Sequence, residues 1–214
     1  MKVIHFHLDF ISPYAYLAFE ALPQALSGID AQVMYRPVLF AGILKHHGQL
    51  GPAEIAPKRD WTYRQVLWQA RQHSIALNMP RQHPFNPLAL LRLALACSPD
   101  ASGTVTREIC DRLFRHVWLG GEVADDAERL RALTANLAPL QSPDRAEVKA
   151  ALRANTDAAI ASGVFGVPAF EVDGQIFWGF DSLPMLRAYL LDDPFFSGPW
   201  QSAASVGEGV IRRS

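Results

Sequence analysis

The sequence has few cysteines, and their spacing excludes a disulfide framework. Only two of the 214 residues are cysteine, Cys97 and Cys110, and no C-x-x-C pair is present. This arrangement fits neither a set of paired cysteines nor the ligand spacing of a zinc site. We therefore interpret both as apolar residues buried in helices and not as a redox pair.

Charge is also scarce, and apolar runs are short. Charged residues make up 19% of the chain and the net charge is −1, which predicts no nucleic-acid partner. No apolar stretch approaches the roughly 18 residues that a membrane-spanning helix needs. Histidines interrupt the opening M-K-V-I-H-F, unlike the apolar part of a signal peptide. We expect a cytoplasmic protein that does not contact the membrane.

Hydrophobic residues make up 50% of the sequence, and their first organised stretch runs from His5 to Leu17. Alternate apolar residues mark one face of a strand, namely Ile4, Phe6, Leu8 and Phe10. Ser12 is a favourable N-cap and Pro13 suits the first helical position, so a helix is predicted from Pro13 to Leu26. Ser12 then lies where α/β folds place ligands and where the helix dipole stabilises an anion.

The rest of the chain predicts an α/β domain interrupted by helices. Residues 31–39 form a second strand, parallel to the first, and residues 40–57 form a loop or a short helix between loops. Helical periodicity then predicts five helices: Lys58–His73, Pro87–Cys97, Thr104–Leu119, Asp125–Asn136 and Pro143–Ala161. We expect a helical domain at 46–160, inserted in an α/β domain made of residues 1–45 and 161–214.

Strand signals return at Gly166. Asp173-Gly174 separates two apolar-rich runs and predicts a hairpin. A last helix is predicted at Leu183–Leu191, followed by an irregular tail from Asp192. The predicted order is β-α-β, helical insertion, β-β-α.

This order resembles the thioredoxin superfamily, in which a C-P-x-C redox site follows the first strand and a cis-proline lies opposite. The two cysteine positions are Ser12 and Ala15 here, so thiol–disulfide exchange through them is impossible. The reacting sulfur must come from a ligand. The proline of Val167-Pro168 matches the cis-proline; the base rate for an X-Pro bond favours trans, and only the resemblance implies cis.

Within the superfamily, the chain is similar to the 2-hydroxychromene-2-carboxylate isomerases, which resemble kappa-class glutathione transferases. Five segments carry the resemblance over almost the whole chain: D-F-I-S-P-Y-A-Y-L-A (9–18), A-P-K-R (56–59), P-F-N-P (84–87), G-V-F-G-V-P-A-F (163–170) and F-W-G-F-D (177–181). The resemblance implies a homodimeric, glutathione-dependent isomerase of a small aromatic carboxylate. Its reaction would proceed by thiolate addition, bond rotation and elimination.

The resemblance also implies roles for single residues. Ser12 is the expected catalytic residue, donating a hydrogen bond to the glutathione sulfur. The other residues expected to bind glutathione are Val167, Pro168, Trp178, Gly179, Phe180 and Asp181. The residues expected to face the aromatic substrate are Lys45, Lys58 and Asn86. Phe180 stands where the family commonly has asparagine, and Ser182 replaces a frequent arginine.

Other interpretations of these residues remain open. Ser12 and Asp181 can be plain helix caps, Asn86 can cap the helix after Pro87, and Lys58 can belong to a solvated helix start. A kappa-like transferase and a non-enzymatic thioredoxin-like binding module are the alternative functions. A serine hydrolase is disfavoured because no G-x-S-x-G motif surrounds Ser12.

Two further side-chain groups are predicted to be structural. His5 and His7 share a strand face, but no third ligand is evident, so no metal site is predicted. The aromatic group Trp61, Tyr63 and Trp68 is predicted to pack between helices.

Overall fold

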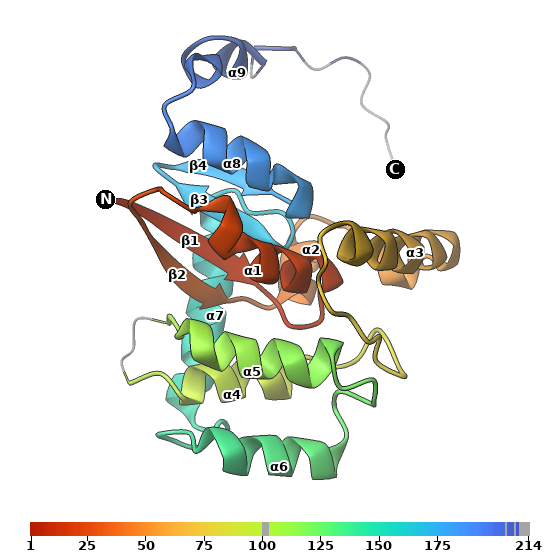
Figure 1. Ribbon diagram of the computed structural model, residues 1–214. Coiled ribbons are helices and arrows are strands. Elements are labelled where there is room, and N and C mark those ends of the chain that lie inside the picture. Colours follow the sequence, from red (N-terminus) through yellow and green to blue (C-terminus); the bar gives the residue numbers. More distant parts are fainter. Residues whose placement is uncertain (100–102, 204, 208, 210–214) are drawn as a thin grey trace.

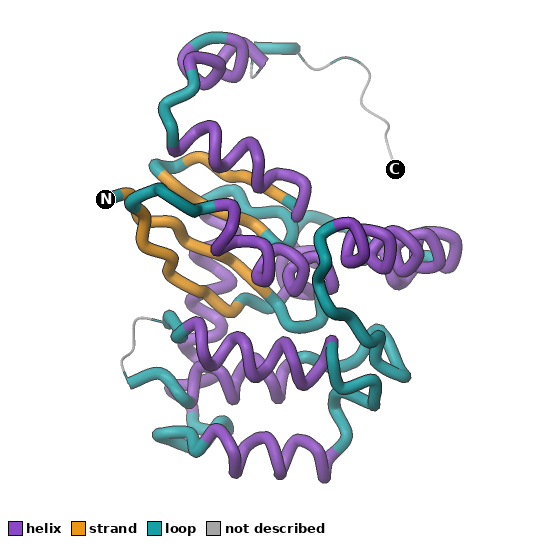
Figure 2. Tube along the Cα trace, viewed as in Figure 1, coloured by secondary structure: helices purple, strands orange, loops and turns teal. Residues whose placement is uncertain are grey.

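The computed structural model describes residues 1–99, 103–203, 205–207 and 209. Its centre is a four-stranded mixed sheet with strand order β2-β1-β3-β4 (Figures 1 and 2). The strands are β1 (Lys2–Leu8), β2 (Ala31–Pro37), β3 (Ala169–Val172) and β4 (Gln175–Trp178). β1 is parallel to β2, and β3 is antiparallel to both β1 and β4. The predicted parallel β-α-β unit and the hairpin at Asp173-Gly174 are confirmed.

Helix α1 (Pro13–Ala25) joins β1 to β2. The described part of the segment between β2 and β3 holds six α-helices: α2 (Phe40–His46), α3 (Ala56–Gln72), α4 (Leu88–Ala96), α5 (Arg107–Trp118), α6 (Ala127–Leu137) and α7 (Ala146–Ala161). The five predicted helices are therefore confirmed. Four of them, α4 to α7, start one to three residues later than predicted. In α5 and α6 the later start has a visible cause, because the side chains of Thr106 and Asp126 act as N-caps and accept backbone N–H groups of the first turn.

The chain beyond β4 contains more helix than predicted. α8 (Leu183–Leu190) follows the hairpin, and the described part of the tail holds α9 (Pro199–Ala203). The short 3₁₀ segments are Pro52–Glu54, Phe180–Ser182 and Pro194–Ser197. The tail packs back on the sheet, because the ring of Trp200 stacks 5.9 Å from that of Phe177. The prediction of an irregular tail is thus wrong up to residue 203, and residues 204, 208 and 210–214 lie outside the described part.

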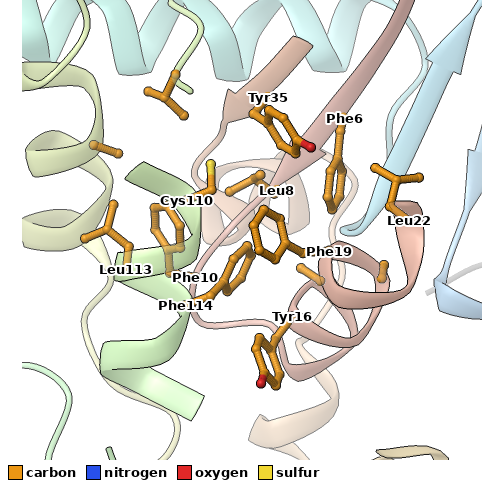
Figure 3. Close-up of a cluster of buried hydrophobic side chains, with 14 of the residues drawn as sticks. Phe6, Leu8, Phe10, Tyr16, Phe19, Leu22, Tyr35, Cys110, Leu113 and Phe114 are labelled. Atoms are coloured by element: carbon orange, nitrogen blue, oxygen red, sulfur yellow. The ribbon is translucent and has the colours of Figure 1, made fainter. Parts of the chain in front are cut away.

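One apolar core joins the sheet to the helices of the insertion. Figure 3 shows Phe10, Phe19 and Phe114 turned toward one another from the turn after β1, from α1 and from α5. The ring of Phe114 lies 4.9 Å from Phe10 and 5.1 Å from Phe19, and all three side chains are fully buried. A smaller apolar cluster lies on the other face of the sheet, where α7 crosses behind it (Figure 1). The division into 1–45, 161–214 and 46–160 stays a prediction, and the main core crosses its boundaries.

The predictions for the two cysteines and for the tryptophans of α3 have different outcomes. Cys97 and Cys110 are both free. Cys110 is buried as predicted, which raises the pKa of its thiol, whereas Cys97 is only half-buried at the end of α4. The prediction that Trp61 and Trp68 pack between helices is wrong, because they are 64% and 55% exposed. α3 buries only Val66 and Ala70, so most of the helix surface faces solvent. No helix in the described part of the chain is both long and apolar enough to span a bilayer.

Candidate active site

Ser12 closes the turn that joins β1 to α1, hereafter the Ser12 turn (Asp9 to Ser12). Its Oγ accepts the N–H of Ala15 at 3.2 Å, so the predicted N-cap is confirmed. The same hydroxyl donates to the Val167 carbonyl over 3.4 Å, which is long for an O–H···O hydrogen bond. This hydrogen bond is therefore weak, and the Ser12 hydroxyl can donate instead to a better acceptor beside it.

The segment opposite Ser12, Val167-Pro168, pairs with the residue that follows β4. The Val167-Pro168 peptide is cis, as the resemblance implied. The Pro168 carbonyl accepts the N–H of Gly179 at 2.9 Å. Gly179 has a φ of 96°, and a Cβ there would lie 2.5 Å from Oδ1 of Asp181. Only glycine fits this position, and the Asp181 carboxylate folds back over it.

Trp178 and Phe180 flank Gly179 but differ in exposure. Trp178 is 53% exposed, with its ring 5.0 Å from that of Phe165. Phe180 is buried, and its ring packs edge-on 4.8 Å from His73 at the end of α3. The ring of Phe180 therefore belongs to the core, and Trp178 offers the accessible aromatic surface.

The residues expected to face the substrate lie on three exposed segments. Lys45 is in the last turn of α2 and Lys58 is in the first turn of α3. Lys58 contributes to a cavity of about 380 Å³, whose other lining residues are Pro52, Pro57, Trp61 and Thr62. Asn86 Oδ1 accepts the N–H of Leu88 at 3.1 Å, so its local capping role is confirmed. No hydrogen bond among the described residues joins Lys45, Lys58 or Asn86 to Ser12.

A hydrogen bond between α1 and α3 shows which face of α3 lies toward the start of α1. The hydroxyl of Tyr14 donates to Oε1 of Gln65 at 2.7 Å. Lys58 precedes Gln65 by seven residues, so both lie on one helix face, about 10 Å apart along the axis. The cavity at Lys58 is thus on the face of α3 that meets the start of α1. Sequence patterns gave Gln65 no role, since the contact links two separate helices.

Asp9 is a second residue that the sequence left without a role. Its carboxylate is fully buried and accepts the N–H of Ile11 at 3.2 Å and that of Phe40 at 3.0 Å. Burial raises the pKa of Asp9 to about 7. Asp9 thus joins the Ser12 turn to the first residue of α2. An acidic residue within a run of buried apolar ones was the available signal.

The two strand histidines both have protein partners. His7 is buried and its Nε2 lies 2.9 Å from Glu171 Oε2, and this hydrogen bond lowers the pKa of Glu171. His5 Nδ1 accepts a hydrogen bond from Arg36 at 3.0 Å. Among the described residues, no group of three histidine, cysteine or acidic side chains is placed to hold a metal ion.

The groups around Ser12 fit a thiol that ionises. The first turn of α1 contains no acidic residue, and the positive end of the helix dipole favours an anion there. Ala15 stands in the first turn of α1 and cannot form a disulfide. The arrangement can stabilise a thiolate brought by a ligand, and it has no second sulfur with which to oxidise it.

The sheet, the cis-proline and the helix that follows the first strand define a thioredoxin-like protein. Residues 3–191 match the family described as "DSBA-like thioredoxin domain", and the chain belongs to this family. The confirmed fold is a thioredoxin-like α/β domain with a large helical insertion.

Curated relatives cover most of the chain. A glutathione S-transferase kappa 2 of Caenorhabditis elegans is 28% identical over 92% of this chain and 95% of its own length. A 2-hydroxychromene-2-carboxylate isomerase of Sphingobium xenophagum is 29% identical over 89% of this chain and 99% of its own length. A solved 2-hydroxychromene-2-carboxylate isomerase matches with a TM-score of 0.69 at 20% identity, covering 96% of this chain and 100% of that chain.

Proposed function

We propose that the protein is a glutathione-dependent isomerase of 2-hydroxychromene-2-carboxylate or a related aromatic ring-cleavage product. The observation that carries the proposal is the Ser12 hydroxyl at the start of α1, opposite the cis Val167-Pro168 peptide. Ala15 in place of a second thiol favours a reaction without net redox change. The relatives named as 2-hydroxychromene-2-carboxylate isomerases support the substrate class.

Ser12 serves as a hydrogen-bond donor in this proposal. Glutathione supplies a thiolate nucleophile, whose addition and later loss allow the substrate bond to rotate. The helix terminus contributes about 1 kcal/mol to the anion, and a hydrogen bond to a charged group contributes about 2 kcal/mol. Together they lower a thiol pKa by about two units from its usual value of about 8.5. Ser12 keeps its proton throughout.

The remaining site residues hold the two ends of the ligands. Val167 pairs its backbone with the cysteinyl part of glutathione, and Trp178 covers it. Asp181, exposed beside Gly179, accepts the γ-glutamyl ammonium. Lys58 pairs with the substrate carboxylate from the apolar cavity that it lines, and Lys45 and Asn86 contact the rest of the substrate.

Replacing the hydroxyl tests the proposal. Ser12→Ala should raise the pKa of the bound thiol by about one to two units and lower kcat about thirtyfold, the effect of losing about 2 kcal/mol. The thiol pKa is measured from the ultraviolet absorption of the thiolate in the complex. Thr106→Ala is the matched control, because it removes the N-cap hydroxyl of α5 far from the site. An unchanged thiol pKa in Ser12→Ala would rule out the donor role.

A kappa-like transferase is the second candidate, supported by the kappa-class relatives. The two functions share the thiolate and differ in the electrophile. Rates of arylidene pyruvate isomerisation and of chloro-dinitrobenzene conjugation separate them, and faster conjugation would favour the transferase. Absence of glutathione binding in calorimetry would instead favour a non-enzymatic binding module.

A cytoplasmic homodimer completes the proposal. The large apolar side chains exposed on α3, Trp61, Leu67 and Trp68, support a contact surface, since monomers rarely expose such clusters. Sedimentation at micromolar concentration measures the assembly, and a stable monomer would contradict it.

A further inference from the structure

The peptide unit that links Ile11 to Ser12 is held at both ends. Its N–H, which belongs to Ser12, donates to the Asp9 carbonyl at 3.0 Å. Its carbonyl, which belongs to Ile11, lies 2.8 Å from Nε2 of His83. Because a peptide unit is planar, two such bonds fix its rotation about the chain. Ser12 follows this unit directly, so its backbone direction is fixed as well.

The partners of His83 define its protonation. A carbonyl oxygen only accepts, so Nε2 carries the proton in the bond to Ile11. Nδ1 and the carbonyl oxygen of His83 lie 2.8 Å and 2.9 Å from the Tyr63 hydroxyl, whose single proton is donated to one of the two at a time. Burial lowers the pKa of His83, which favours the neutral ring with Nδ1 as acceptor. The ring is therefore a donor on the side of the Ser12 turn and is anchored on the side of α3.

His83 belongs to the insertion, as do the side chains around it. It lies between α3 and α4, with its ring 5.5 Å from Trp118 and 6.0 Å from Phe85. Trp118 Nε1 donates to the Phe10 carbonyl at 3.0 Å. Two consecutive carbonyls of the Ser12 turn thus accept hydrogen bonds from side chains of the insertion.

We propose that His83 is a positioning residue that holds the Ile11–Ser12 peptide and so directs the Ser12 hydroxyl toward the bound thiol. The inference rests on the proposed function for its effect on turnover. Rotation of this peptide would alter the φ of Ser12, observed at −86°, and swing its Oγ away from the Val167 side. The insertion therefore sets the geometry of the thiol site as well as forming the substrate side.

Replacing His83 with phenylalanine removes the donor and keeps an aromatic ring beside Trp118. His83→Phe should raise the thiol pKa and lower kcat about tenfold, the effect of one hydrogen bond of about 1.4 kcal/mol. Glutathione affinity should change less than twofold when it is measured well below the thiol pKa, where the bound thiol is protonated, because His83 contacts the turn and not the ligand. His83→Gln should recover most of the rate, since its side-chain amide is again a donor.

His116→Phe is the matched control. His116 is also partly buried in the insertion, and its Nε2 bonds a backbone carbonyl, that of Ala124, at the same 2.8 Å. His116→Phe should match the loss of thermal stability in His83→Phe while leaving kcat and the thiol pKa unchanged. Equal kinetic losses in both variants would overturn the positioning role and indicate a general packing effect.

A measurement without ligand separates this inference from the proposed function. The amide of Ser12 should exchange its hydrogen at least tenfold faster in His83→Phe than in His116→Phe, as judged by NMR. If glutathione fails to bind but this difference is found, the proposed function fails and the backbone restraint stands. Equal exchange in the two variants overturns the inference even where the enzyme is active.

Discussion

The two halves of the candidate site are built differently. The sulfur half, proposed to consist of Ser12, Val167 and Pro168, is buried, and the backbones of Ser12 and Pro168 form hydrogen bonds with neighbouring segments. The substrate half, proposed to consist of Lys45, Lys58 and Asn86, lies on exposed segments between β2 and β3.

This difference separates two kinds of change. A substitution in the sulfur half disturbs side chains that the fold needs, so it alters stability together with activity. A substitution in the substrate half changes an exposed side chain and leaves the core unchanged. Such an arrangement allows the substrate to change while the thiol chemistry is kept.

The largest loss of unfolding free energy is expected in the core beneath the Ser12 turn. Phe114→Ala removes a fully buried ring that contacts Phe10 and Phe19, and it should lower the unfolding free energy by about 3–5 kcal/mol. Urea unfolding measures the loss. Leu140→Ala, at an exposed side chain after α6, should cost less than about 0.5 kcal/mol. Similar losses in the two variants would break the contrast.

Asp9, buried in the Ser12 turn, makes the unfolding free energy depend on pH. Its folded pKa of about 7 exceeds the usual value of about 3.9, so the native state binds more protons than the unfolded state between these values. Stability from this group therefore falls as pH rises from about 4 to about 7.

Asp9→Asn removes that dependence. Relative to wild type, its unfolding free energy should rise by about 2–3 kcal/mol between about pH 5 and about pH 8. Denaturant titrations at the two pH values measure the change. Asp60→Asn, at an exposed carboxylate on α3, serves as control, and an equal shift there would remove the role of burial.

The smallest effect is expected in the substrate half. Lys58→Ala should raise KM for a carboxylate substrate about fivefold, because an exposed ion pair contributes at most about 1 kcal/mol. The melting temperature and the thiol pKa should stay unchanged. Arg59→Ala, its neighbour outside the cavity, is the control. A large fall in kcat at constant KM would instead indicate that Lys58 acts in the thiol chemistry.

The sequence predicted the features that depend on neighbouring residues. Alternation along β1, the cap at Ser12 and the turn at Asp173-Gly174 are local patterns, and all three are confirmed. The cis form of Pro168 came from the resemblance alone.

Contacts between distant segments were not predictable. His83 and Ile11 are 72 residues apart, and no local pattern reports their hydrogen bond. The error at Trp61 and Trp68 has the same origin. Their aromatic side chains suggested a packed face, but burial depends on whether another element covers it, and α3 buries only two residues.

The tryptophans differ in solvent exposure, so intrinsic tryptophan fluorescence can report on ligand binding. Trp118 lies in a dry environment beneath the Ser12 turn, whereas Trp178 lies half in water at the edge of the thiol site. Indole emission shifts to longer wavelength in water, so Trp178 and the exposed indoles of α3 emit at the red edge of the spectrum and Trp118 at the blue edge. A tripeptide settling against Trp178 would change the red part alone, giving a signal for occupancy that requires no label and no turnover.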